Sequence, residues 1–323
     1  MVHTTRAKEF IEPDNPYNVG MTGIIGNRAG MEAIDAADIM LCLGTDFAWT
    51  QFYPEGKRVV QIDRDPAHLG RRAPVALGLA GDVGDTIAAL LPALTPRQDR
   101  GHLDKALKMW EEDKEGYAKS GEGRDPALIH PQTVTQMLDR LAAPDALFTA
   151  DGGSPMVWLL RHLTANGQRR FLTSLLHGTM ANAYPQAMGL AAAYPQRQTI
   201  ALCGDGGMTM LMGDLLTLVQ EKLPVKLLIF NNGSLGFVEM EQRVEGLLDA
   251  FTGLKKSRLR AAGVRLRAGE LEGGERRRSG SGDDQLAGRR RPGAARREGE
   301  PGRAGDAAED HGGRSRLDGA VRP

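Results

Sequence analysis

Short apolar runs alternate with more polar segments along the first 254 residues. Residues 38–44 and 58–63 have the continuous apolar character of buried parallel strands, and later runs predict strands at 146–150, 198–203 and 225–230. Helices are predicted at 85–91 and 103–119 and from residue 131, where Val134, Met137, Leu138 and Leu141 share one face. Because strands that alternate with helices form covered parallel sheets, the pattern predicts an α/β fold with two doubly wound parallel-sheet units.

The composition changes sharply near Leu254. Residues 255–323 contain 18 Lys and Arg, 11 Asp and Glu, and no Phe, Tyr, Trp, Ile, Met or Cys. Such a segment buries too little apolar surface to offset its ordering entropy, so we predict that it is disordered. A basic tail for RNA or anionic lipid, a solvated tail and a frameshifted translation of GC-rich DNA all fit this composition. The lack of aromatic residues disfavours nucleic-acid binding, and the abrupt change favours a frameshift.

Charge and cysteine use narrow the class of protein further. The formal net charge of +0 argues against nucleic acid or an anionic membrane as the main partner. Cys42 and Cys203 lie in apolar runs and are predicted to be buried thiols, which indicates a reducing compartment. Neither a signal peptide nor an apolar run of about 20 residues is evident, so we expect a soluble cytoplasmic protein.

Two polar motifs follow consecutive predicted strands. Gly204-Asp205-Gly206-Gly207 ends the run 198–203, and Asn231-Asn232-Gly233-Ser234 ends the run 225–230. In a parallel sheet both motifs lie at the edge where open α/β sheets bind ligands. A divalent cation takes oxygen ligands, and glycines let backbone N–H groups approach phosphate, aided by a helix predicted at 208–221. Gly-Asp-Gly alone is usually a turn, whereas together the two motifs predict a metal-diphosphate site.

These motifs resemble the diphosphate domain of thiamine-diphosphate-dependent enzymes. The resemblance implies that Asp205, Asn232 and the backbone carbonyl of Ser234 bind Mg²⁺. Residues 151–155 resemble the first phosphate-contacting loop, and 177–182 resemble the segment beneath the cofactor. The implied thiamine diphosphate contacts are Gly152, Gly153, Ser154, Gly178, Met180, Asp205, Gly206, Gly207 and Asn232. Taken singly, Met180 could be a core residue and residues 151–153 a turn.

The first unit resembles the later half of the flavin-binding central domain of pyruvate oxidases, through residues 15–26, 44–47 and 62–67. For Asp63 taken alone, a helix N-cap or turn role is the simpler interpretation. The resemblance covers about residues 3–254. The implied FAD contacts are Met21, Thr22, Gly23, Ile24, Gly44, Thr45, Asp46, Phe47, Asp63 and Asp65.

The resemblance implies an organisation in four segments. Residues 1–119 form part of a central, FAD-type domain, and a linker follows at 120–130. Residues 131–254 form most of the diphosphate-binding domain, and the tail occupies 255–323. We therefore expect the chain to be a fragment of a pyruvate oxidase or pyruvate:quinone dehydrogenase.

The implied function of the intact enzyme is flavin-linked oxidative decarboxylation of pyruvate to acetate and CO₂, with thiamine diphosphate, Mg²⁺ and FAD as cofactors. An acetolactate synthase-like carboligase and a non-catalytic cofactor-binding module are the alternatives. In the family, the catalytic glutamate lies in a separate N-terminal domain, so we expect no catalytic residue here and an inactive chain on its own. Electrons pass to quinone or oxygen, the full-length form is expected to be a homo-oligomer, and peripheral membrane contact is expected only in full-length relatives.

Overall fold

The computed structural model describes residues 1–119 and 129–255. Most of the predicted linker and all but the first residue of the predicted tail therefore lie outside the described residues. Within them, all five predicted strands are present and every strand pairing is parallel, which confirms the predicted α/β class. None of the described helices is long and apolar enough to cross a membrane.

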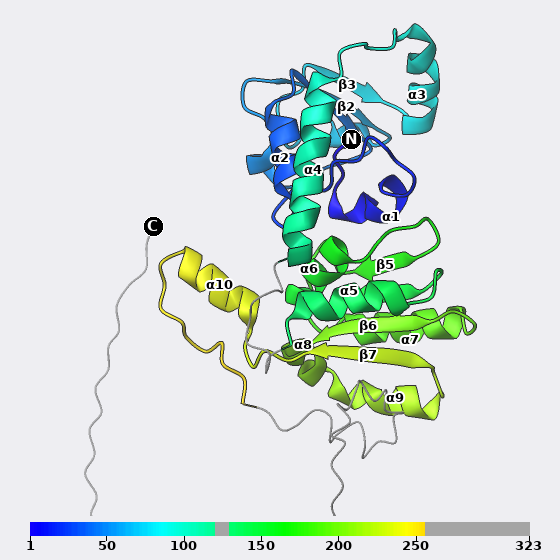
Figure 1. The fold of residues 1–323 in the computed structure, drawn as a ribbon, viewed down its shortest axis with the longest axis vertical. Helices are drawn as coiled ribbons and strands as arrows, with labels where there is room; N and C mark the ends of the chain where they lie inside the picture. The colour runs from blue at the N-terminus through cyan, green and yellow to red at the C-terminus, as the bar shows by residue number, and fades with distance from the viewer. Residues whose placement is uncertain (120–128, 256–323) are drawn as a thin grey trace, which may run out of the picture. The chain divides into compact units, whose positions relative to one another are not determined.

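The first sheet has three strands in the order β1-β2-β3, of which Figure 1 labels β2 and β3. Their bounds are Ile39–Leu43, Arg58–Asp63 and Leu77–Ala80. The helices of this part are α1 (Lys8–Ile11), α2 (Arg28–Asp35), α3 (Val83–Leu90) and α4 (Gly101–Lys119), with 3₁₀ turns at Thr5–Ala7, Thr50–Phe52, Pro66–His68 and Leu91–Ala93. Helices α2 and α4 pack together around Ala33 and Ala106.

The prediction that β1 is a buried strand is only partly correct. Cys42 is buried, but Ile39 and Leu41 are 47% and 45% exposed. Successive strand residues point to opposite faces, and these two residues share the face of Leu77, which is also exposed. The apolar run therefore fixed the strand but not its burial, because only one face of the sheet is well covered at this end.

The second sheet has four strands in the order β5-β4-β6-β7. Their bounds are Arg170–Thr173 for β5, Leu147–Ala150 for β4, Thr199–Gly204 for β6 and Val225–Phe230 for β7. The surrounding helices are α5 (Pro131–Leu141), α6 (Ser154–His162), α7 (Ala183–Ala193), α8 (Asp205–Met210), α9 (Leu215–Gln220) and α10 (Gly236–Val244) (Figure 1).

Two hydrophobic cores lie on opposite faces of this second sheet. Ile200 and Leu202 of β6 pack with Leu159 and Leu160 of α6 in one core. Ala201 and Cys203, the alternate residues of the same strand, pack with Tyr184 of α7 and Leu215 of α9 in the other. Because successive side chains of β6 point to opposite faces, this strand contributes to both cores. Cys203, like Cys42, is a buried free thiol as predicted.

The helix predicted at 208–221 differs from the observed structure. Helix α8 already begins at Asp205, a 3₁₀ turn occupies Met212–Asp214, and α9 then starts at Leu215. The N–H of Asp214 donates to the carbonyl of Leu211 at 2.9 Å, which closes the intervening turn. Gly213 and Asp214 have low helix propensity, which explains why one long helix is not formed.

Candidate functional site

Four loops meet at the carboxyl edge of the second sheet. Loop 151–153 follows β4, and loop 231–234 follows β7. Segment 204–207 joins the end of β6 to the start of α8, and segment 177–182 runs between β5 and α7 (Figure 1). The strands are parallel, so their carboxyl ends lie along the same edge. These are the segments that the sequence predicts for a diphosphate and its metal.

Asp151 links three of these segments through hydrogen bonds to its carboxylate. Its carboxylate is 1% exposed, and its Oδ1 and Oδ2 accept hydrogen bonds from the N–H groups of Ala183 and Gly204, each at 2.9 Å. Burial raises the pKa of the Asp151 carboxyl, and hydrogen bonds from backbone N–H groups oppose this shift only in part. Asp151 was not among the predicted contact residues, although an acidic residue between a buried strand and two glycines was the available signal.

Glycines make the close approach of the loops possible. A Cβ atom on Gly152 would overlap the carbonyl oxygen of Gly178, and one on Gly207 would overlap Oδ2 of Asp151. A Cβ on Gly206 would lie 3.0 Å from the Cε of Met180. The structure therefore brings the predicted residues of three loops into direct contact, with the Met180 side chain packed close to Gly206.

Segment 177–182 has an unusual backbone next to this contact. Gly178 has a φ of +58°, and the buried Ala181 has a φ of +61°. A non-glycine residue in the left-handed region is uncommon and is often found at functional sites. His177 is exposed on the same segment.

The three predicted metal ligands lie on two joined loops. Asp205 is 3% exposed, and its Oδ2 accepts a hydrogen bond from the N–H of Gly233 at 2.7 Å. Its Oδ1 accepts from Gly206 N at 2.8 Å. The exposed Asn232 turns its Oδ1 toward the N–H of Ser234, at 3.2 Å. Asp205 thus connects the β6 loop to the β7 loop, where Asn232 and Ser234 lie.

The start of α6 reaches the same place. Gly153, with a φ of +111°, turns the chain into α6, whose first residue is Ser154. A Cβ on Gly236 would lie 2.9 Å from the Nδ2 of Asn232 and 3.8 Å from the Oγ of Ser154. The predicted contact Ser154 and the predicted ligand Asn232 are therefore near neighbours around the first residue of α10.

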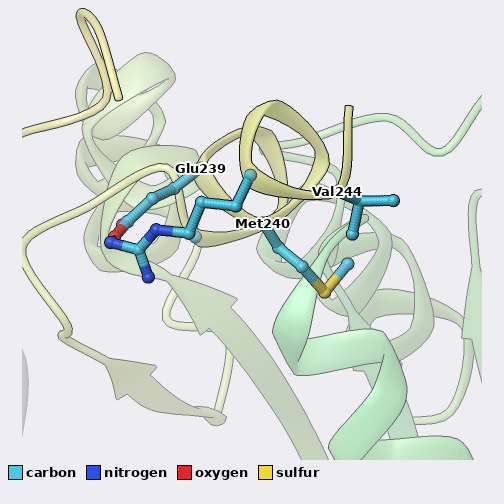
Figure 2. A pocket seen from close by; sticks show the side chains of 5 residues that line it. Glu239, Met240 and Val244 are labelled. Carbon is cyan, nitrogen blue, oxygen red and sulfur yellow. The ribbon is translucent and has the colours of Figure 1, made fainter. Parts of the chain in front are cut away.

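Helix α10 contributes a residue that sequence reasoning missed. Glu239 accepts a hydrogen bond from the Oγ of Ser234 at 2.6 Å and one from Arg243 at 2.5 Å. It also lines a pocket of about 380 Å³ with Gly236, Met240, Arg243 and Val244 (Figure 2). All five lining residues belong to α10, and Glu239 reaches the loop 231–234 through Ser234, so we regard Glu239 as a support for Ser234. A single glutamate on an amphipathic helix gave no signal for this role.

The predicted flavin residues fall into two groups in the first unit. Gly23 has a φ of +100°, and a Cβ there would lie 3.3 Å from the ring of Phe47. The second group consists of Asp46, Asp63 and Asp65, which lie around Arg71. The hydrogen bond from Arg71 to Asp46 and the nearby charges of Asp65 and Asp63 raise the pKa of Arg71. The hydrogen bond from Arg71 also lowers the pKa of Asp46.

The predicted flavin residues also differ in burial. Met21, Thr22, Gly23 and Phe47 are buried, and the Thr22 hydroxyl is one of the buried polar groups without a hydrogen-bond partner among the described residues. Exposed candidates are Ile24, Gly44 and Asp65, while Thr45 and Asp46 are half-buried.

Asp63 has the turn role that was its simpler interpretation. Its Oδ1 accepts a hydrogen bond from the N–H of Asp65 at 2.9 Å, and the Oδ1 of Asp65 accepts from Ala67 N at the same distance. Both carboxylates therefore stabilise the turn after β2. A contact of either residue with FAD remains a prediction.

Family comparison covers both units. Residues 151–261 match the C-terminal TPP binding domain of thiamine pyrophosphate enzymes, and residues 1–90 match the central domain of the same enzymes. The chain belongs to the thiamine pyrophosphate enzymes. Thiamine pyrophosphate is the thiamine diphosphate of the predicted site, so the superfamily predicted from the motifs is confirmed.

Several curated relatives show how far the likeness to other thiamine pyrophosphate enzymes extends. The chain is 34% identical over 259 residues to the putative thiamine pyrophosphate-containing protein YdaP of Bacillus subtilis, covering 79% of this chain and 44% of the relative. It is 30% identical to a pyruvate oxidase of Lactiplantibacillus plantarum and 31% identical to an acetolactate synthase of Mycobacterium avium. In both cases 75% of this chain and 40% of the relative are covered. The chain thus spans less than half the length of these relatives.

The loops of this thiamine pyrophosphate enzyme fit a metal-bound diphosphate. Gly152, Gly206 and Gly207 let the segments that carry the candidate ligands pack closely together, and these ligands are all oxygen atoms, which suit Mg²⁺. Among the described residues, no group of three or more His, Cys, Asp and Glu side chains could hold a metal ion. A cation at this edge would therefore depend on amide, carbonyl and phosphate oxygens in addition to Asp205.

Proposed function

We propose that this chain supplies the metal- and diphosphate-binding part of an enzyme that oxidatively decarboxylates pyruvate to acetate and CO₂, with thiamine diphosphate, Mg²⁺ and FAD. The observation that carries the proposal is the convergence of the four loops at one sheet edge, joined by the buried carboxylates of Asp151 and Asp205. The likeness to a pyruvate oxidase supports the choice of substrate.

Each loop has a distinct task in this proposal. Asp205 and Asn232, with the carbonyl of Ser234, would hold Mg²⁺, and the backbone of segments 151–153 and 204–207 would bind the diphosphate. The backbone at Gly178 and Met180 would hold the aminopyrimidine ring, and the Met180 side chain would contact the cofactor. When bound, thiamine diphosphate supplies the carbon nucleophile that attacks the keto-acid carbonyl. Asp151 keeps the loops together and has no contact with substrate.

The flavin and the partners belong to the same proposal. FAD binds along the segment from Met21 to Ile24 and near Phe47, where Gly23 permits a close approach. The buried thiols Cys42 and Cys203 support a reducing, cytoplasmic location. The full-length enzyme is a homo-oligomer that passes electrons to quinone or oxygen and needs no nucleic acid.

Binding of the cofactor tests the central part of the proposal. Isothermal titration of the whole chain with thiamine diphosphate should show saturable binding in the presence of Mg²⁺ and much weaker binding with EDTA. Asp205→Asn should weaken binding about tenfold or more, because it removes the charged metal ligand. The matched control is Asp214→Asn, which changes an exposed carboxylate nearby and should bind as the wild type does. Equal binding by Asp205→Asn and the wild type would contradict the proposed metal site.

An acetolactate synthase-like activity is the competing function, because that relative is as similar to this chain as the pyruvate oxidase is. Product analysis separates the two: pyruvate-dependent dye reduction with acetate supports oxidation, whereas acetolactate supports carboligation. Cofactor binding with neither product would instead support a non-catalytic binding module.

A further inference from the structure

Helix α6 contacts a different predicted cofactor segment at each of its two ends. Its first residue, Ser154, follows the loop 151–153 directly. In its last turn, Arg161 donates from Nε to the carbonyl of Ile25 at 3.0 Å and from a terminal nitrogen to the carbonyl of Gly26 at 2.9 Å. A helix rises about 1.5 Å per residue, so the two contacts are roughly 10 Å apart along a stiff element.

The segment that Arg161 holds packs into the core beneath α6. Met21 and Ile25 belong to the same buried cluster as Leu159 and Leu160 of the helix. The segment is also closed on itself, since Gly26 N donates to the carbonyl of Gly23 at 2.8 Å. A displacement of α6 would therefore shift residues 21–26 together rather than one at a time.

The guanidinium of Arg161 is fixed from a second side. Its Cζ lies 5.7 Å from the centroid of the Tyr117 ring, a cation–π contact with the last turn of α4. A planar guanidinium that binds two adjacent carbonyls has a defined orientation, which a lysine ammonium cannot reproduce. The position of Arg161 is therefore specified by three groups outside its own helix.

We propose that Arg161 is a positioning residue that couples the diphosphate loop 151–154 to the segment 21–26. Order at one segment stabilises the other through α6, and this coupling is reciprocal. The inference rests on the proposed function, because the benefit of coupling is that bound thiamine diphosphate prepares the segment proposed to bind the flavin. The coupling itself is a property of the chain before any cofactor binds.

Hydrogen exchange with mass spectrometry tests the coupling without any ligand. Arg161→Gln should speed exchange about tenfold in peptides covering residues 19–27 and 151–158, because it removes two charge-assisted hydrogen bonds. Arg161→Lys, which is more conservative, should show a smaller increase in the same two peptides. The matched control is Arg170→Gln: Arg170 pairs with Glu9 at 3.0 Å and touches neither segment, so faster exchange should be confined to the region of Glu9. Unchanged exchange at 151–158 in Arg161→Gln would overturn the coupling.

A second arm with thiamine diphosphate and Mg²⁺ separates coupling from a purely structural role. In the wild type and in Arg170→Gln, the ligand should slow exchange both at 151–154 and at 21–26. In Arg161→Gln, slowing should persist at 151–154 and disappear at 21–26. Binding with no effect at 21–26 in the wild type, or with the same effect in Arg161→Gln, would overturn the inference and leave the proposed function intact. Absence of binding in the wild type would instead overturn the proposed function, and the ligand-free arm would still decide the coupling.

Discussion

Each of the two sheets has an acidic residue at the carboxyl end of a parallel strand, and these two residues have different structural roles. After β4, the buried Asp151 accepts hydrogen bonds from Ala183 and Gly204, which lie 32 and 53 residues away in sequence. At the end of β2, Asp63 accepts from Asp65, two residues away. The first carboxylate organises tertiary structure and the second stabilises a local turn.

The segments packed around the two carboxylates account for this difference. Both residues are buried, with Asp151 1% and Asp63 8% exposed. A buried carboxylate must find internal donors, because water does not reach it. Around Asp151 those donors come from two distant segments, whereas Asp63, next to the exposed strand β3, finds its donor in the turn that follows β2. The comparison teaches that the residue after a strand takes its role from the layers around it.

The largest effect is expected from a methyl group at Gly152. Gly152→Ala places a Cβ against the carbonyl oxygen of Gly178, where only backbone could yield, so the free energy of unfolding should fall by about 3 kcal/mol. The matched change Gly189→Ala lies in the exposed part of α7 with no atom within 4 Å of the added Cβ, and it should stabilise by up to about 1 kcal/mol. Urea denaturation measures both, and equal effects would refute the proposed close approach of the loops.

A smaller effect should separate the two carboxylates. In Asp151→Asn, the NH₂ group replaces one of the two carboxylate oxygens and faces a backbone N–H, so one hydrogen bond is lost and a buried donor is left without an acceptor. The free energy of unfolding should therefore fall by about 2 to 3 kcal/mol. Asp63→Asn keeps a side-chain oxygen for the Asp65 N–H and should cost about 1 kcal/mol or less. Thermal unfolding of the two variants at pH 7 makes the comparison. A cost for Asp63→Asn as large as that for Asp151→Asn would mean that both carboxylates organise tertiary structure.

The smallest effect concerns pH dependence at His162, which stacks on Trp158 with ring centroids 5.7 Å apart. Burial lowers the pKa of His162 to about 4, from an ordinary value of 6.5. Because the folded-state pKa is depressed, its contribution to stability is present above pH 6.5 and is lost as the pH falls toward about 4.

His162→Phe keeps an aromatic ring and removes the titration, so melting temperature should fall less steeply between pH 6.5 and 4 than in the wild type. The control is the exposed His102, whose replacement by Phe should retain the wild-type pH dependence. Parallel pH profiles for His162→Phe and the wild type would show that this histidine does not contribute to acid sensitivity.

Local signals in the sequence were sufficient for much of the second unit. Strands β6 and β7 are six-residue apolar runs that end in glycine- or asparagine-rich loops, so both the strands and the motifs after them could be located. Strand β3 was missed because it has four residues, contains Gly78 and is exposed. The start of α8 was missed because Gly206 and Gly207 are poor helix formers in isolation.

The sequence by itself determined five of the seven described strands, the residue types at the carboxyl edge and the family to which they belong. Tertiary structure decided which distant groups meet: Asp151 with Gly204, and Arg161 with Ile25, 136 residues away. It also decided burial, since Thr135 of α5 is fully buried while Leu141 of the same helix is 77% exposed. Periodicity reports the direction of a side chain within its own element. Which segment packs against that side chain depends on contacts between residues far apart in sequence, and the local pattern does not predict these contacts.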